Sequence, residues 1–311
     1  MNSVTTRVRG VPETAERGAS LPRAGKAAAT GAAGPRERRG AARLLLGTAA
    51  VVLVFPFLYM VLLSLQRTSD LGPGGLLPRP GNLTFDNYAA MARAIDVWHA
   101  LGNSLVFTAG AVLATVVIGL PAGYALARLS FRGRAVTFTV LLSILVVPFV
   151  LLMIPMYVIT VRDFRLADSY LGMVLPYAVN PLAVYLFRQF FRRLPAEVFE
   201  AARLDGASET RTLWRVAVPL ARPAILSAVL VTCIVPWNEF LWPFLVAKNA
   251  SMQPMAVGLA GFVSTLRYQG LANGFGVMMA GAVVLVLPVI VLVAVFLRWF
   301  VQVDLGSGSK G

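Results

Sequence analysis

Charged side chains are scarce in this sequence. They make up 14% of the 311 residues, whereas 58% are hydrophobic, and the mean hydropathy is +0.73. Because a soluble domain is usually about 45–50% apolar, this composition excludes an ordinary soluble fold and indicates a membrane protein. The chain also has one cysteine, Cys233, which excludes an intrachain disulfide or a cysteine metal cluster.

Catalytic and nucleotide-binding motifs are equally scarce. The single histidine, His99, has no second histidine with which to form a zinc pair, and no G-x-S-x-G sequence is present. The nearest approach to a phosphate-binding loop is Gly25-Lys26, but Ser20 replaces its first glycine and Ala27 its hydroxyl residue. The chain is therefore predicted not to be an enzyme and to bind no metal or cofactor, with His99 at the membrane interface.

What the sequence does contain is a set of long apolar runs. Six of them are nearly free of charge and long enough, at roughly 20 helical residues, to cross a bilayer: 44–65, 104–127, 135–161, 169–187, 223–247 and 276–297. None shows the period-two alternation of a barrel strand, so the predicted fold is all-α, a polytopic bundle of six transmembrane helices. Prolines inside these runs predict kinked spans.

Lysine and arginine indicate how the bundle is oriented. If the N-terminus is cytoplasmic, most of them fall in the inner segments 1–43, 128–134, 188–222 and 298–311. This bias predicts that both termini are cytoplasmic, and it explains the net charge of +14 without nucleic-acid binding. Residues 1–42 are rich in Ala, Arg and Gly and are expected to form a disordered basic tail, which leaves 43–311 as the membrane domain.

The loop 188–222 is too long and too structured to be a simple connection. Leu194-Pro195 favours a helix start, and Gly206 favours its end, because glycine enters the left-handed conformation at low cost. Ser208 can cap a second short helix that ends near Pro219. The loop thus predicts a compact cytoplasmic elbow, 194–223, made of a helix, a turn and a helix.

The first helix of this elbow is expected to dock on a partner. Val198, Ala201 and Ala202 form a narrow stripe of small residues, flanked by Glu197 and Glu200, which lets another surface approach closely. An amphipathic helix lying on lipid headgroups is the alternative, but such helices have a broad face of large apolar residues and a lysine-rich polar face. Docking to a cytoplasmic protein is therefore favoured.

The stretch EAARLDGASETRTLWRVAVP resembles the EAA motif of the membrane subunits of binding-protein-dependent ABC importers. The motif is Glu-Ala-Ala, three residues, Gly, nine residues, then Ile-x-Leu-Pro, and every spacing holds here, with valines at 216 and 218 for Ile and Leu. The matching residues are Glu200, Ala201, Ala202, Gly206, Val218 and Pro219. The segments 102–134 and WNEF (237–240), with the closing KG, are similar to the smaller permease of maltose-type sugar systems.

This resemblance, which covers residues 43–311, implies the MetI-like bundle of a type I importer. It also implies a second permease, two ATPase subunits that hold ATP and magnesium, and an extracytoplasmic solute-binding protein. The six EAA-matching residues would then couple the elbow to the ATPase. The implied function is import of a sugar or sugar derivative across the cytoplasmic membrane of a prokaryote.

Polar residues inside the spans are candidates for the solute path, because burying them in a membrane is costly. They are Asn180 in the fourth run and Trp237, Asn238 and Glu239 in the fifth. Interface anchoring, gating or packing between helices is the alternative and is favoured over direct solute contact. For the whole chain, the alternatives are an ion-coupled secondary transporter, an importer of a non-sugar solute and a purely structural membrane protein.

Overall fold

The protein is mostly helical in the part that the computed structural model describes, which is residues 35–67, 83–268 and 274–307. These ranges contain no strand, only an isolated bridge between Gln66 and Leu83. The helical segments are α1 (Pro35–Ser64), α2 (Asp86–Ala94), α3 (Val97–Arg128), α4 (Arg134–Ile144), α5 (Phe149–Tyr157), η2 (Val158–Asp163), α6 (Tyr170–Val174), η3 (Leu175–Tyr177), α7 (Pro181–Arg193), α8 (Ala196–Leu204), α9 (Glu209–Thr212), η4 (Leu213–Ala217), α10 (Val218–Leu220), α11 (Arg222–Asn238), α12 (Leu241–Val246), η5 (Ala250–Met252), α13 (Met255–Tyr268) and α14 (Phe275–Ser307).

The chain divides into two compact units, residues 1–54 and 55–311. The first unit contains the start of α1, which begins at Pro35, inside the tail that was predicted to be disordered. The rest of that predicted tail, residues 1–34, lies outside the described residues. All contacts discussed below lie within the second unit.

Three helices are long and apolar enough to cross a membrane alone, namely Arg43–Ser64 of α1, α3, and Phe275–Phe296 of α14. Three helix pairs pass the same test together but are bent: Arg134–Ile144 with Phe149–Asp163 (98°), Tyr170–Tyr177 with Pro181–Arg193 (50°), and Glu209–Leu220 with Arg222–Asn238 (77°). Counting each bent pair as one span gives up to six spans. The predicted polytopic all-α fold is confirmed.

Prolines account for several of the breaks. Pro148 precedes α5, Pro181 begins α7, and α11 ends two residues after Pro236, so that the predicted run 223–247 is split into α11 and α12. Other helices continue through a proline, at Pro56, Pro121 and Pro288. A proline in these runs therefore permits a break without requiring one, because neighbouring helices and polar side chains can compensate for the lost hydrogen bond.

The helix α3 is the centre of the second unit and packs most extensively against α7 and α11. Gly119 and Gly123, one turn apart on α3, face α7, and a Cβ added at Gly123 would lie 2.5 Å from the Cβ of Phe187. Such small residues let two backbones approach closely, which drives helix association where lipid surrounds the protein. Next to this contact, Leu120, Tyr124 and Phe191 belong to a buried apolar cluster that extends to the elbow.

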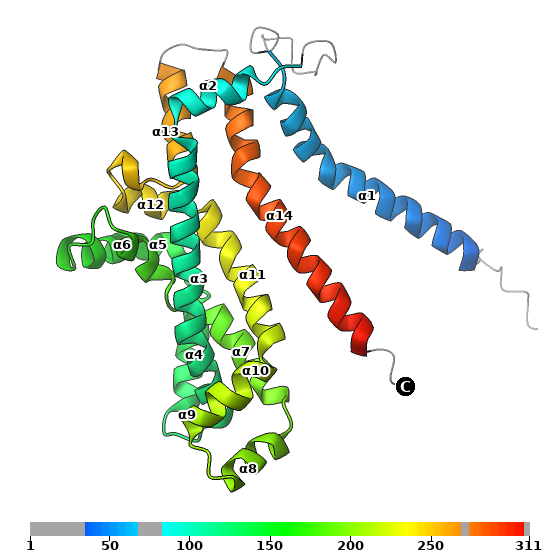
Figure 1. Ribbon diagram of the computed structural model, residues 1–311, viewed down its shortest axis with the longest axis vertical. Helices are drawn as coiled ribbons and strands as arrows, with labels where there is room; N and C mark the ends of the chain where they lie inside the picture. Colours follow the sequence, from blue (N-terminus) through cyan, green and yellow to red (C-terminus); the bar gives the residue numbers. More distant parts are fainter. Residues whose placement is uncertain (1–34, 68–82, 269–273, 308–311) are drawn as a thin grey trace, which may run out of the picture. The chain divides into compact units, whose positions relative to one another are not determined.

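Figure 1 shows what α3 connects. The helices α8 and α9 lie at its C-terminal end, and α2 and α13 lie at its N-terminal end. At the N-terminal end, Asn103 donates to the backbone carbonyls of Ser251 and Gln253 at 2.9 and 3.1 Å, and His99 Nε2 lies 2.6 Å from the same Ser251 carbonyl. The single histidine is therefore part of a structural contact in the first turn of α3.

Candidate coupling elbow and solute-path cavity

The turn after α8 has the geometry that the sequence predicts. Gly206 has a φ of +73°, and its N–H donates to the carbonyl of Arg203 while the N–H of Ala207 donates to the carbonyl of Ala202. This pair of bonds is the Schellman motif, in which a left-handed residue satisfies the last carbonyls of a helix. The side chain of Ser208 then accepts a 3.3 Å hydrogen bond from the N–H of Arg211 and caps α9, as predicted.

The exposed face of α8 differs from the prediction. Ala202 is buried, and Val198 packs against the same buried apolar cluster, whereas Ala201 is exposed. The predicted stripe of small residues is therefore divided between the inner and outer sides of the helix. The reason is Phe199, which is 4% exposed and turns its side of α8 toward the bundle.

The outer face of α8 consists of two carboxylates and one large apolar side chain. Glu197, Glu200, Ala201 and Leu204 are exposed and lie at spacings of three and four residues. Leu204 is 89% exposed. An apolar side chain so fully accessible at the tip of a short helix is suited to a partner with a small apolar pocket.

The second half of the elbow ends close to the predicted stop at Pro219. The chain forms α9, the π-helical turn η4 and α10, and α10 ends at Leu220, one residue after Pro219. Proline is tolerated because it lies in the first turn of α10, where a backbone N–H has no helical acceptor. The chain bends by 77° between Leu220 and Arg222, with Val218 half-buried before the bend.

Polar contacts join the elbow to α3. The hydroxyl of Tyr124 donates to Glu209 Oε2 at 2.9 Å, and Glu209 Oε1 forms a 2.9 Å ion pair with Arg203. Arg128, one turn after Tyr124, lies 4.2 Å over the ring of Phe199. Its guanidinium also donates to the carbonyls of Phe191 and Leu194, before α8. The residues in these contacts belong to no common sequence motif, so the contacts could not be predicted from the sequence.

A largely apolar cavity of about 610 Å³, with a few polar groups in its lining, lies where three broken spans meet. Its walls come from the break between α4 and α5, from the break before α7, and from the end of α11. Asn180 and Glu239, both predicted as solute-path residues, line it together with Tyr177. Interrupted spans are a recurring way to build solute sites in transporters.

Asn180 and Glu239 also have structural roles at this cavity. The side chain of Asn180 caps α7 by accepting a 3.1 Å hydrogen bond from the N–H of Ala183. Glu239 Oε1 accepts from the N–H groups of Leu241 and Trp242 at 3.0 and 3.3 Å and so satisfies the start of α12. Both residues therefore stabilise the breaks that form the cavity, whether or not they contact a solute.

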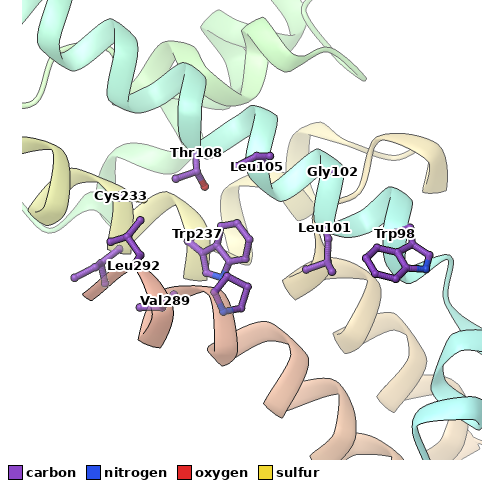
Figure 2. A pocket seen from close by; sticks show the side chains of 11 residues that line it. Trp98, Leu101, Gly102, Leu105, Thr108, Cys233, Trp237, Val289 and Leu292 are labelled. Carbon is purple, nitrogen blue, oxygen red and sulfur yellow. The ribbon is translucent and has the colours of Figure 1, made fainter. Parts of the chain in front are cut away.

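Trp237 and Asn238 lie away from this cavity. Asn238 donates to the carbonyl of Ile234, one turn earlier in α11. Trp237 is 7% exposed, and its indole N–H donates to the carbonyl of Leu285 in α14 at 2.8 Å. Figure 2 shows the Trp237 ring beside Cys233 and Val289 in an apolar pocket of about 410 Å³ between α3, α11 and α14. Of the four predicted residues, the structure brings two together.

Tyr177 is the cavity residue that sequence reasoning missed. Its hydroxyl is buried beside the carboxylate of Glu239, although no hydrogen bond of ordinary geometry joins the two among the described residues. The pair brings a hydroxyl and a carboxylate together in the cavity wall. The available signal was a polar-tipped aromatic residue beside Pro176 in an apolar run.

Comparisons with known proteins agree on the family. The family model described as binding-protein-dependent transport system inner membrane component matches residues 116–303. The arabinooligosaccharides transport system permease protein of Halalkalibacterium halodurans is 31% identical, over 84% of this chain and 93% of its own. The trehalose transport system permease protein of Mycobacterium tuberculosis is 33% identical, over 83% of this chain and 93% of its own.

A solved structure gives the same result. A chain from the crystal structure of a bacterial ABC transporter involved in the import of the acidic polysaccharide alginate superposes with a TM-score of 0.74. It is 26% identical, and the match covers 85% of this chain and 97% of the other. The chain therefore belongs to the binding-protein-dependent transport system inner membrane component family, and it is a non-catalytic, membrane-spanning permease of an ABC importer.

Proposed function

We propose that this permease imports a sugar or sugar derivative and is driven by ATP hydrolysis in a separate ATPase subunit. The elbow is the observation that carries the proposal. It has the EAA spacing, it turns at the left-handed Gly206, and it exposes Leu204 on its outer surface. The sugar class is supported by the relatives, which are named for arabinooligosaccharides and trehalose.

The proposed assembly contains four kinds of chain: this permease, a second permease as its heterodimer partner, two ATPase subunits and an extracytoplasmic solute-binding protein. ATP and magnesium belong to the ATPase subunits, because the best phosphate-loop match in this sequence, at Gly25-Lys26, lacks the first glycine and the hydroxyl residue. The EAA residues Glu200, Ala201, Ala202, Gly206, Val218 and Pro219 form the coupling surface and its support.

The proposed orientation places the elbow and both termini in the cytoplasm. The Lys and Arg bias supports this orientation. The elbow and the basic loop around Arg132 both adjoin the C-terminal end of α3, so they share one side of the membrane.

The proposed solute path includes the cavity at Tyr177, Asn180 and Glu239. A mixed lining of apolar groups, a hydroxyl, an amide and a carboxylate is suited to sugar rings, which combine apolar faces with many hydroxyl groups. The helix-capping bonds of Asn180 and Glu239 support packing and gating as their first role. Trp237 and Asn238 act in this proposal as packing residues of α11.

The test is reconstitution of the whole transporter in proteoliposomes, with uptake of a labelled oligosaccharide measured in the presence and absence of ATP. The variant Gly206→Asp adds an anion at the docking turn and should abolish uptake while the protein still inserts. Gly133→Asp is the matched control, because Gly133 is also a left-handed glycine with no atom within 4 Å of an added Cβ.

Uptake that requires ATP and is lost only in Gly206→Asp supports the proposal. Uptake that follows an ion gradient without ATPase subunits would instead make the chain a secondary transporter. Normal uptake in Gly206→Asp would remove the coupling role of the elbow.

A further inference from the structure

Tyr124 of α3 contacts both halves of the elbow, since its ring lies beside Phe199 of α8 and its hydroxyl bonds to Glu209 of α9. We propose that Tyr124 is a positioning residue, whose hydroxyl holds Glu209 and thereby transmits displacement of the elbow to α3. This inference rests on the proposed function, because it presumes that an ATPase moves the elbow. It concerns Tyr124, which lies outside the EAA stretch, and Glu209, which lies within that stretch but is not one of its six matching residues.

The geometry of the Tyr124 hydroxyl is specific. Tyr124 is 3% exposed, and its ring lies between Phe191 and Phe199, at centroid distances of 5.6 and 6.2 Å. From this enclosed position the hydroxyl donates to Glu209 Oε2 at 2.9 Å. A hydrogen bond to an ionised acceptor is stronger than one between neutral groups, and here the donor is enclosed while the side chain of the acceptor, Glu209, is 42% exposed.

The carboxylate of Glu209 is shared between two helices. While Oε2 accepts from Tyr124 on α3, Oε1 accepts from Arg203 Nε and Nη2 on α8, at 3.1 and 2.9 Å. Glu209 itself begins α9, directly after the turn at Gly206. One carboxylate therefore fixes α8 and α9 relative to each other and fixes both to α3.

Packing alone does not define this arrangement. Phe199, Leu213 and Ala217 bury the inner side of the elbow in the apolar cluster, and apolar contacts hold surfaces together without fixing their direction of movement. The Tyr124 bond is directional, so it resists sliding of the elbow across the end of α3. Removing the hydroxyl should leave the elbow folded and docked but less firmly connected to α3.

The helix α3 is suited to carry such a displacement. Its 32 residues form one helix, about 48 Å long at 1.5 Å per residue. Its other end is held by Asn103 on the carbonyls of Ser251 and Gln253, and by Ser104, which accepts from the N–H of Met255 at 2.9 Å. Displacement at Tyr124 therefore reaches the loop on the opposite side of the bundle.

The experiment compares Tyr124→Phe with the parent chain in the complete reconstituted transporter. Phenylalanine keeps the ring and removes only the hydroxyl. We expect the solute imported per ATP hydrolysed to fall roughly fivefold or more, the range typical of coupling between sites, while the ATPase subunits remain bound. Glu209→Ala should show the same loss, and the double variant should be no worse than either single one.

Tyr185→Phe is the matched control. Tyr185 lies on the adjacent α7 and stacks on Phe138, and among the described residues no hydrogen bond joins it to the elbow. The transporter with Tyr185→Phe should import as much solute per ATP hydrolysed as the parent. A fall in Tyr185→Phe equal to that in Tyr124→Phe would overturn the inference.

Three further results would also overturn it. They are unchanged coupling in Tyr124→Phe, additive losses in the double variant, and loss of the ATPase subunits from Tyr124→Phe, which would make the hydroxyl a folding determinant. Failure of the proposed function is distinguishable, because the parent transporter itself would then show no ATP-dependent uptake.

Discussion

Glu239 combines a structural role with a place on the proposed solute path. Its Oε1 accepts from two N–H groups at the start of α12, and the residue lines the cavity formed by the broken spans. The sequence marks Glu239 as exceptional, because an acidic residue within a span is costly. It does not distinguish a solute contact from a helix cap, since both roles use the same carboxylate oxygens.

Two substitutions at Glu239 separate these roles. Glu239→Gln keeps an oxygen acceptor for α12, so we expect normal assembly and an altered transport rate. Glu239→Ala removes the acceptor and should also lower the free energy of unfolding by about 1 kcal/mol, as loss of a helix cap does. Thermal melting of the purified transporter, measured beside uptake, checks both; an unaltered transport rate in Glu239→Gln would leave the residue with a structural role alone.

At the scale of elements, the positions of the spans were predictable because apolar run length and proline placement determine them. The exposed face of α8 was not, because a helix this short offers only two turns of pattern, and small residues occur on both of its sides. Phe199 determines which face of α8 is buried, since a phenylalanine in a short polar helix is buried if any apolar surface is available. The π-helical turn before Pro219 was not predictable either, because no residue pattern marks it.

The contact between α3 and α7 gives a prediction about packing. A Cβ at Gly123 would lie 2.5 Å from the Cβ of Phe187 and 3.0 Å from the backbone nitrogen of Arg188. Because backbone atoms cannot move aside as a flexible side chain can, Gly123→Ala should destabilise the bundle by about 1–3 kcal/mol.

Gly102→Ala is the control for this substitution, since Gly102 lies on the same helix with no atom within 4 Å of an added Cβ. It should leave the melting temperature unchanged or slightly raised, because alanine favours helix more than glycine does. Equal melting temperatures for the two variants would contradict the close contact between α3 and α7.

At the scale of the whole molecule, composition and the EAA spacing were sufficient to predict a polytopic importer permease. The cavity and the Tyr124 contact were not predictable, because they join residues that are far apart in the chain and share no motif. The solute was not predictable either, because in the proposed assembly a second permease shares the path.

Crosslinking from the outer face of α8 tests the central claim that this face docks on the ATPase. In a Cys233→Ser background, which removes the only native cysteine, Leu204→Cys places a thiol where the side chain is 89% exposed, and Ala202→Cys places one where it is 9% exposed. We predict that Leu204→Cys crosslinks to the ATPase subunit within the intact transporter and that Ala202→Cys does not. Capture of the ATPase by neither variant, or equally by both, would contradict the account.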